Sequence, residues 1–446
     1  MMGRGSDRVH PGRIIAGSFL VVIAIGAVLL STPWATASGE RARLLDAVFT
    51  STSAVCVTGL VTVDTGSYWS VFGQLTILGL IQVGGLGLMT LASLTVVLIS
   101  RRLGVRARMV AQAQTRTLST ADIGRVVRNV TVFTVASEVL VALVLTIRFT
   151  TGYQMSFGEG LYSGVFHSIS AFNNAGFSLN TDSLMPYVAD AWVILTISAA
   201  VVVGGLGFPV LFEIARAWRK PRSWSVTTKI TIGTTAALLV LGTLVMASVE
   251  HRNPDTIGAM PAGQALLASF FAALTPRTAG FNSIDVGAMT SEGLLATDVL
   301  MFIGGGSAGT AGGIKVTTVG LLAIVVWAEM RGNPTVNLGF RQIPADNQRQ
   351  ALAVAVLGAL VAALSTFILM NLTDFSLDQV MFETISALGT VGMSTGITAQ
   401  IPDGGKWVII VLMYLGRLGP LTLASALALR PRERRWEPPT ERITVG

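Results

Sequence analysis

The chain has little charge, a single cysteine and few histidines. Charged residues make up 12% of its 446 positions, hydrophobic residues make up 51%, and the mean hydropathy is +0.66. This balance excludes an ordinary soluble domain and indicates a membrane protein with several spans. Cys56 is the only cysteine, so an internal disulfide is excluded and cysteine usage says nothing about the redox compartment.

Two motifs of enzymes are matched only in part. Residues 305–309 fit the Gly-x-Ser-x-Gly pattern of a hydrolase nucleophile, which also needs a base. The only histidines are His10, His167 and His251. The Gly-rich run before Lys315 is not a phosphate-binding loop, because Ile314 interrupts it and no Ser or Thr follows the lysine. We therefore predict that the chain is not an enzyme and binds no organic cofactor.

Eight apolar segments are each long enough to cross a hydrocarbon core ~30 Å thick. They are residues 14–31, 71–100, 130–147, 191–212, 230–248, 294–328, 351–370 and 407–429. The first segment follows three arginines and precedes Ala35-Thr36-Ala37, as a cleaved signal peptide would. We interpret it as a spanning helix, because cleavage would remove a helix that the other repeats possess.

A phenylalanine followed ten positions later by a glycine occurs four times, after the first, third, fifth and seventh segments. The copies are Phe49 to Gly59, Phe166 to Gly176, Phe270 to Gly280 and Phe382 to Gly392. A helix of about nine residues rises only ~13 Å, less than half of the hydrocarbon core. Each copy therefore predicts a short re-entrant helix and an extended loop, which are tolerated at membrane depth where they line a water-filled cavity.

The basic residues predict the orientation. Of 31 Lys and Arg, 23 lie in five clusters on one side of the predicted spans, at residues 4–13, 101–128, 216–229, 331–349 and 430–442. The positive-inside rule then puts both termini in the cytoplasm. The other side carries fifteen acidic and five basic residues, which favours cations at the outer mouth. We attribute the net charge of +7 to basic residues that lie beside lipid headgroups, and we expect no nucleic acid as a partner.

Each unit has two full spans, so all four units point the same way, unlike the inverted repeats of many transporters. The predicted fold is an all-α polytopic membrane protein with four parallel helix–pore-helix–helix repeats around a pseudo-fourfold central pore. The predicted repeats are 1–105, 106–222, 223–333 and 334–430, and a cytoplasmic tail follows at 431–446.

The residues at the four glycines predict a cation filter. Glycine permits the backbone dihedrals that point carbonyl oxygens inward, where they replace the hydration shell of an ion. One such glycine would indicate only close helix packing, whereas four at equal offsets favour a filter. The predicted filter residues are Val57, Thr58, Gly59, Asn174, Ala175, Gly176, Thr278, Ala279, Gly280, Thr390, Val391 and Gly392.

These units resemble the Trk/Ktr/HKT superfamily of potassium transporters, and Thr390-Val391-Gly392 resembles the filter of potassium channels. The lack of two extra leading helices makes the match nearest to the membrane subunits of bacterial Ktr systems, over residues 13–430. The resemblance implies K⁺ uptake across the cell inner membrane. It also implies a homodimer with two pores, docked on a cytosolic ring of nucleotide-binding (RCK) subunits.

The second helix of the third unit has six glycines in ten residues, each costing ~1 kcal/mol relative to alanine. We predict a broken helix with a mobile loop beneath the filter, which the resemblance implies is the gate; a packing kink is the alternative. Arg417 replaces a glycine of the other units and would form a barrier to cations, unless it pairs with the interior. The predicted gate residues are Gly304, Gly305, Gly306, Ser307, Ala308, Gly309, Thr310, Ala311, Gly312, Gly313, Lys315 and Arg417.

Several features leave alternatives open. Asn173, Asn174 and Arg277 beside the glycines break the fourfold chemistry, which leaves sodium leakage or sodium dependence open. The alternative functions are a less selective Na⁺/K⁺ channel or another cation or solute transporter. Glu138, inside the third span, could coordinate a coupling ion or form hydrogen bonds between helices.

Overall fold

The computed structural model describes residues 11–87, 120–338 and 341–419. Within these ranges the chain is helical except for loops and one antiparallel pair of two-residue strands, β1 (Asn337–Leu338) and β2 (Arg341–Gln342). Most of the predicted basic cluster at 101–128, and the predicted tail at 431–446, lie outside the described residues.

Four units share one arrangement, in which a long helix is followed by a short helix, an extended loop and a second helix. The first consists of α1 (Pro11–Leu30), α2 (Leu44–Val55) and the helix Val71–Gly87, with α3 (Thr65–Tyr68) in its loop. The second consists of α5 (Thr120–Gly152), α6 (Phe157–Phe172), α7 (Ala191–Leu206) and α8 (Phe208–Ala217). The third consists of α9 (Val226–Glu250), α10 (Ala262–Leu274), α11 (Ser291–Phe302) and α12 (Val316–Met330). The fourth consists of α13 (Ala345–Leu372), α14 (Leu377–Gly389) and α15 (Asp403–Leu418).

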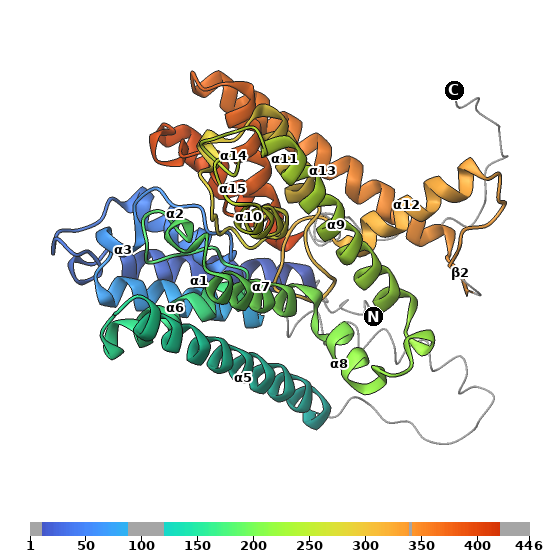
Figure 1. Ribbon diagram of the computed structural model, residues 1–446, viewed down its shortest axis with the longest axis horizontal. Helices are drawn as coiled ribbons and strands as arrows, with labels where there is room; N and C mark the ends of the chain where they lie inside the picture. Colours follow the sequence, from blue (N-terminus) through green and yellow to red (C-terminus); the bar gives the residue numbers. More distant parts are fainter. Residues whose placement is uncertain (1–10, 88–119, 339–340, 420–446) are drawn as a thin grey trace, which may run out of the picture.

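The units close a ring in sequence order. The second helix of each unit packs against the short helix of the next, as α7 does on α10, α11 on α14, and α15 on α2. Between the first and second units, the Tyr162 hydroxyl of α6 donates a hydrogen bond of 2.6 Å to Gln74 Oε1. Figure 1 shows α5 and α13, the long helices of the second and fourth units, along opposite edges of the molecule. The fourfold arrangement predicted from the repeats is therefore present, while the exact limits of the repeats stay predictions.

The short helices are longer than the predicted nine residues, at 12 to 16 residues. They begin well before the phenylalanine, because Ser156 with Glu159 and Ser376 with Gln379 form capping boxes at the starts of α6 and α14. At ~1.5 Å per residue they rise roughly 18–24 Å, which is still less than a hydrocarbon core. The prediction that they do not span holds, although the predicted length is wrong.

The long helices carry apolar side chains on their outer faces. In α13, Leu360, Leu364 and Phe367 are each more than 60% exposed, and in α9 Val240, Leu241 and Leu244 are each 60% exposed. Among the described residues three helices are long and apolar enough to cross a membrane, namely Gly124–Gly152, Val226–Glu250 and Ala345–Leu372, and the bent pair α7 and α8 makes a fourth if it is one span. Large apolar surfaces of this kind fit contact with lipid.

Two predicted spans are interrupted. The segment 294–328 breaks between Phe302 and Val316, as its glycine content predicts. The segment 191–212 is also broken, because α7 and α8 meet at Gly207 with a bend of 101°, and here the prediction of one continuous helix is wrong. At the second break the Gly205 carbonyl accepts a hydrogen bond of 2.8 Å from the Gly306 amide, and the Gly204 carbonyl accepts one of 3.2 Å from the Thr310 amide, both in the loop of the third unit. Pro209, at the start of α8, has no amide hydrogen to offer the Gly205 carbonyl.

We expect Gly207→Ala to lower stability by about 1–3 kcal/mol, because φ is +90° there and a Cβ would lie 3.0 Å from the Gly309 amide nitrogen. The unfolding temperature in detergent measures this effect. Gly233→Ala in α9 is the control, since a Cβ there meets no atom within 4 Å. Equal unfolding temperatures for the two variants would contradict a strained contact between the second and third units.

Candidate cation-binding site

The backbone of all four filter loops follows one pattern of dihedral angles. The residue two positions before each glycine has a positive φ, as does the glycine itself, and the residue between them does not. The non-glycine residues are Val57, Asn174, Thr278 and Thr390, with φ of +55°, +58°, +75° and +50°. Alternating signs of φ turn successive carbonyl groups to the same side of the chain. A positive φ costs of order 1–3 kcal/mol outside glycine, and its recurrence in four loops indicates a functional constraint.

The four glycines meet around the axis of the ring. A Cβ on Gly59 would collide with the Ala175 carbonyl oxygen, one on Gly280 with that of Val391, and one on Gly392 with that of Thr58. On Gly176 it would lie 3.0 Å from the Ala279 oxygen and 2.9 Å from the Gly280 Cα. Each glycine thus faces the carbonyl of the next unit in the order one, two, three, four, one. The structure brings the sequence-predicted filter residues of all four units together.

Serine residues in the short helices hold these loops. The Ser53 carbonyl oxygen accepts a hydrogen bond of 2.8 Å from Thr58 N–H, and Ser53 Oγ accepts one of 3.0 Å from Gly59 N–H. Ser386 makes the equivalent bonds in the fourth unit, at 2.8 and 3.1 Å. Ser170, in the second unit, donates from Oγ to the Phe177 carbonyl at 2.7 Å. Sequence reasoning missed these residues, although serine six positions before the glycine in three of the four copies is a readable signal.

An outer cavity of about 510 Å³ opens directly above the ring and is lined by all four filter glycines. Asp64, Asp182 and Asp285 also line it, which gives the entrance a negative charge. Other acids counted on the outer side are buried, among them Glu250 and Glu383, both 0% exposed. The acidic mouth predicted from the sequence is therefore built by fewer residues than the count suggests.

The loop between α11 and α12 folds back on itself beneath the ring. Its ends lie together, because Gly304 N–H donates to the Ile314 carbonyl at 2.8 Å and Val316 N–H to that of Gly305 at 3.0 Å. A Cβ on Gly312 would collide with Thr390 Oγ1 of the fourth filter loop. Of the predicted gate residues, Gly304 to Lys315 therefore form one loop whose tip presses against the underside of the filter, whereas Arg417 lies in α15.

Thr310 at the tip of this loop contacts the second and fourth units directly and is linked to the first through Arg417. Its Oγ1 accepts a hydrogen bond of 2.6 Å from Asn174 Nδ2 of the second filter loop, and its carbonyl accepts one from Arg417 Nη1. Arg417, 2% exposed, also donates from Nη2 to the Gly84 carbonyl at 2.9 Å. The guanidinium thus pairs with the interior, as the alternative from the sequence has it, and it also fixes the loop; a barrier to cations at Arg417 stays a prediction.

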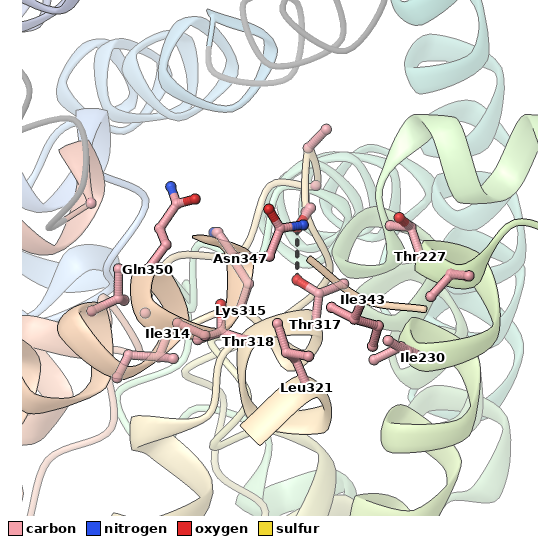
Figure 2. A pocket seen from close by; sticks show the side chains of 18 of the residues that line it. Thr227, Ile230, Ile314, Lys315, Thr317, Thr318, Leu321, Ile343, Asn347 and Gln350 are labelled. Carbon is pink, nitrogen blue, oxygen red and sulfur yellow. Dashed lines mark hydrogen bonds between the residues drawn. The ribbon is translucent and has the colours of Figure 1, made fainter. Parts of the chain in front are cut away.

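An inner cavity of about 680 Å³ lies on the far side of the loop from the filter. Figure 2 shows its wall, with Thr227 and Ile230 from α9, Thr317 from α12 and Asn347 and Gln350 from α13. Lys315 also lines it and donates from Nζ to the Ala311 carbonyl at 2.5 Å. The loop thus lies between the filter and this cavity, with positive side chains on its inner side.

Glu138 and the three polar residues beside the filter glycines, Asn173, Asn174 and Arg277, have different hydrogen-bond partners. Glu138 accepts hydrogen bonds of 3.0 Å from Gln82 Nε2 and 3.0 Å from Asn173 Nδ2, so it links helices of the first two units behind the filter. Arg277 is 8% exposed and donates to Thr235 Oγ1 at 3.4 Å. Asn174 alone of the three reaches the loop beneath the filter.

The family model described as "TrkH: Cation transport protein" matches residues 10–437 of the chain. The chain is 41% identical to Ktr system potassium uptake protein B of Bacillus subtilis (strain 168), over 94% of each chain. It is 39% identical to Ktr system potassium uptake protein B of Vibrio alginolyticus, over 97% of this chain and 94% of that protein. It is 34% identical to the potassium/sodium uptake protein NtpJ of Enterococcus hirae, over 100% of this chain and 99% of that protein.

A solved structure has the same fold. The potassium transporter TrkH from Vibrio parahaemolyticus aligns with a TM-score of 0.73, over 96% of this chain and 87% of that chain, at 20% identity. At that identity the likeness shows the fold alone. It confirms an all-helical polytopic membrane protein.

We expect a monovalent cation that fits the carbonyl ring to stabilise the folded chain, because it binds only where the four loops are assembled. At 100 times its Kd such a ligand contributes ~2.7 kcal/mol. The unfolding temperature in detergent should therefore be higher in KCl than in the chloride of a large organic cation. Gly280→Ala should abolish the difference, whereas Gly263→Ala in α10, which has open space around it, should retain it. A persistent difference in Gly280→Ala would contradict binding at the ring.

Proposed function

Because the chain belongs to the TrkH family of cation transport proteins, we propose that it is the pore subunit of a Ktr-type system and carries K⁺ into the cell. The closed ring of filter carbonyls from four units supports this most directly. An ion in the ring would exchange its hydration shell for backbone oxygens, which needs no cofactor and no catalytic step.

The chain's own residues supply each part of the path. The acids at the outer cavity attract the cation, and the C-terminal ends of the four short helices point their negative dipole ends at the ring. The 303–315 loop below the ring is the proposed gate, since it lies between the ring and the inner cavity. Hydrogen bonds from Asn174 and Arg417 to Thr310 hold it there. For ions to pass, these bonds must break and the loop must move.

Sodium is the second candidate ion. A 34%-identical relative is named a potassium/sodium uptake protein, and the four filter loops differ in sequence, with Asn174 where the others have valine or threonine. We therefore propose K⁺ as the main ion and keep sodium dependence, or a less selective Na⁺/K⁺ pathway, as the alternative.

We propose a multi-pass protein of the cell inner membrane with both termini in the cytoplasm. The names of its relatives describe a Ktr system, and we propose a homodimer docked on a cytosolic ring of nucleotide-binding RCK subunits. The inner ends of α8 and α12 carry Arg216 and Arg331, which suit contact with acidic lipid headgroups or with such a ring. Any control by nucleotides would then act through the partner.

We expect this chain, expressed with a nucleotide-binding ring subunit, to restore growth at low K⁺ of a bacterium that lacks its own uptake systems. Gly392→Asp should abolish this rescue, because a side chain there collides with the Thr58 carbonyl and closes the ring. Gly404→Asp is the matched control, since it adds the same charge at the exposed outer end of α15. Rescue by Gly392→Asp, with the protein present in the membrane, would contradict the assignment of Gly392 to the filter.

Deletion of residues 305–312 should raise K⁺ flux into liposomes. The deletion joins neighbours, because a Cβ on Gly304 would lie 3.4 Å from the Gly313 Cα, so the helices on either side keep their places. Adding Gly392→Asp to the deletion should abolish the flux and show that ions still pass the filter. Unchanged or lower flux in the folded deletion variant would refute the gate.

A further inference from the structure

Two of the four filter loops are tied to their short helices by an ionisable side chain just behind the filter. In both loops the tie joins the residue after the repeat's phenylalanine to the residue two positions after the filter glycine. In the fourth unit these are Glu383 and Ser394, and in the second unit they are His167 and Ser178. Both serines line the outer cavity directly above the ring.

Glu383 is 0% exposed and is bound entirely by the loop that follows the fourth filter glycine. Its Oε1 accepts a hydrogen bond from the Ser394 hydroxyl, and its Oε2 accepts one of 2.9 Å from Thr398 Oγ1. The Ser394 oxygen accepts the Gly396 amide at 2.9 Å in turn. The carboxylate therefore fixes the loop at several points without lying in the path of the ion.

His167 makes the corresponding tie in the second unit. Its Nδ1 lies 2.8 Å from the Ser163 carbonyl oxygen, which can only accept, so Nδ1 carries the proton. Nε2 then accepts from the Ser178 hydroxyl at 3.0 Å. The Ser178 oxygen accepts the Asn180 amide at 3.0 Å, as Ser394 accepts that of Gly396. The two ties use different acceptors but the same serine geometry.

The first and third units lack this tie in the described part of the chain. The equivalent positions are Thr50 and Val61 in the first unit, and Phe271 and Asn282 in the third. Thr50 Oγ1 is buried and has no hydrogen-bond partner among the described residues, and Phe271 is packed in the apolar core. Because the units follow one another around the ring, the two tied loops face each other across the pore.

We propose that Glu383 and His167 are positioning residues that hold two opposite filter loops at a fixed separation and thereby set the preference for K⁺ over Na⁺. A carbonyl ring that is held open cannot contract around the smaller ion, whereas a loop released at its outer end can do so. The inference rests on the proposed function and deepens it, because it names the residues that discriminate between the two ions.

The test compares K⁺ and Na⁺ uptake by purified protein in liposomes. Ser394→Ala, Glu383→Leu and His167→Phe each remove a tie, and the last installs the residue type that the third unit has at this position. Each should lower the ratio of K⁺ to Na⁺ flux by about tenfold or more, mainly through faster Na⁺ entry. Glu383→Gln keeps one oxygen that can accept the Ser394 hydroxyl, and its amide group can donate to the Thr398 oxygen, so the ratio should stay within about threefold of the original.

Thr50→Val is the matched control at the untied position of the first unit and should leave the ratio unchanged. An unchanged ratio in Ser394→Ala and His167→Phe, or an equal fall of both fluxes, overturns the proposal, since a purely structural tie affects both ions alike. If the unaltered chain carries no K⁺, the proposed function fails instead. The positioning role is then decided by unfolding temperatures in KCl and NaCl, where an unchanged preference in Ser394→Ala overturns it.

Discussion

The structure depends on one constraint. Where the backbone carbonyls of a loop face an ion, the N–H groups of the same loop must find hydrogen-bond acceptors elsewhere in the protein. Buried amide groups without partners are costly, most of all at membrane depth. Here N–H groups of the first and fourth filter loops donate hydrogen bonds to their own short helices, where the carbonyl and hydroxyl oxygens of Ser53 and Ser386 accept them. The strained positive φ angles of four non-glycine residues persist because these bonds and the surrounding helices hold them.

The helices serve that constraint through close contacts at glycine. A side chain at Gly84 would collide with the Val55 carbonyl, one at Gly204 with that of Phe172, and one at Gly416 with that of Leu388. In each case the second helix of a unit seats the C-terminal end of its own short helix. These glycines therefore act in helix packing, whereas those of the filter loops combine a positive φ with close approach to the carbonyl of the next unit. The same residue type has two roles, distinguished by the sign of φ.

The third unit departs from the others at this same place. Gly304 faces Gly312 of its own loop rather than the end of α10, and the chain leaves the helix to cross beneath the filter. The backbone of this loop bonds to the second and fourth units instead. Its N–H groups donate to the carbonyls of Gly204 and Gly205, and the Thr310 carbonyl accepts from Arg417. These contacts lie at the bend between α7 and α8, so the glycine-rich loop of one unit meets the broken helix of another.

The sequence by itself determined the class of protein, the four units, the four glycines that meet in the ring and the break at 303–315, because these follow from hydropathy, equal spacing and glycine content. It did not determine the length of the short helices, the bend at Gly207 or the partners of Arg417 and Thr310. It also gave no sign that His167 and Glu383 bind the filter loops. These depend on contacts between residues far apart in the chain, and a local pattern carries no information about which carbonyl or hydroxyl the folded ring brings within reach.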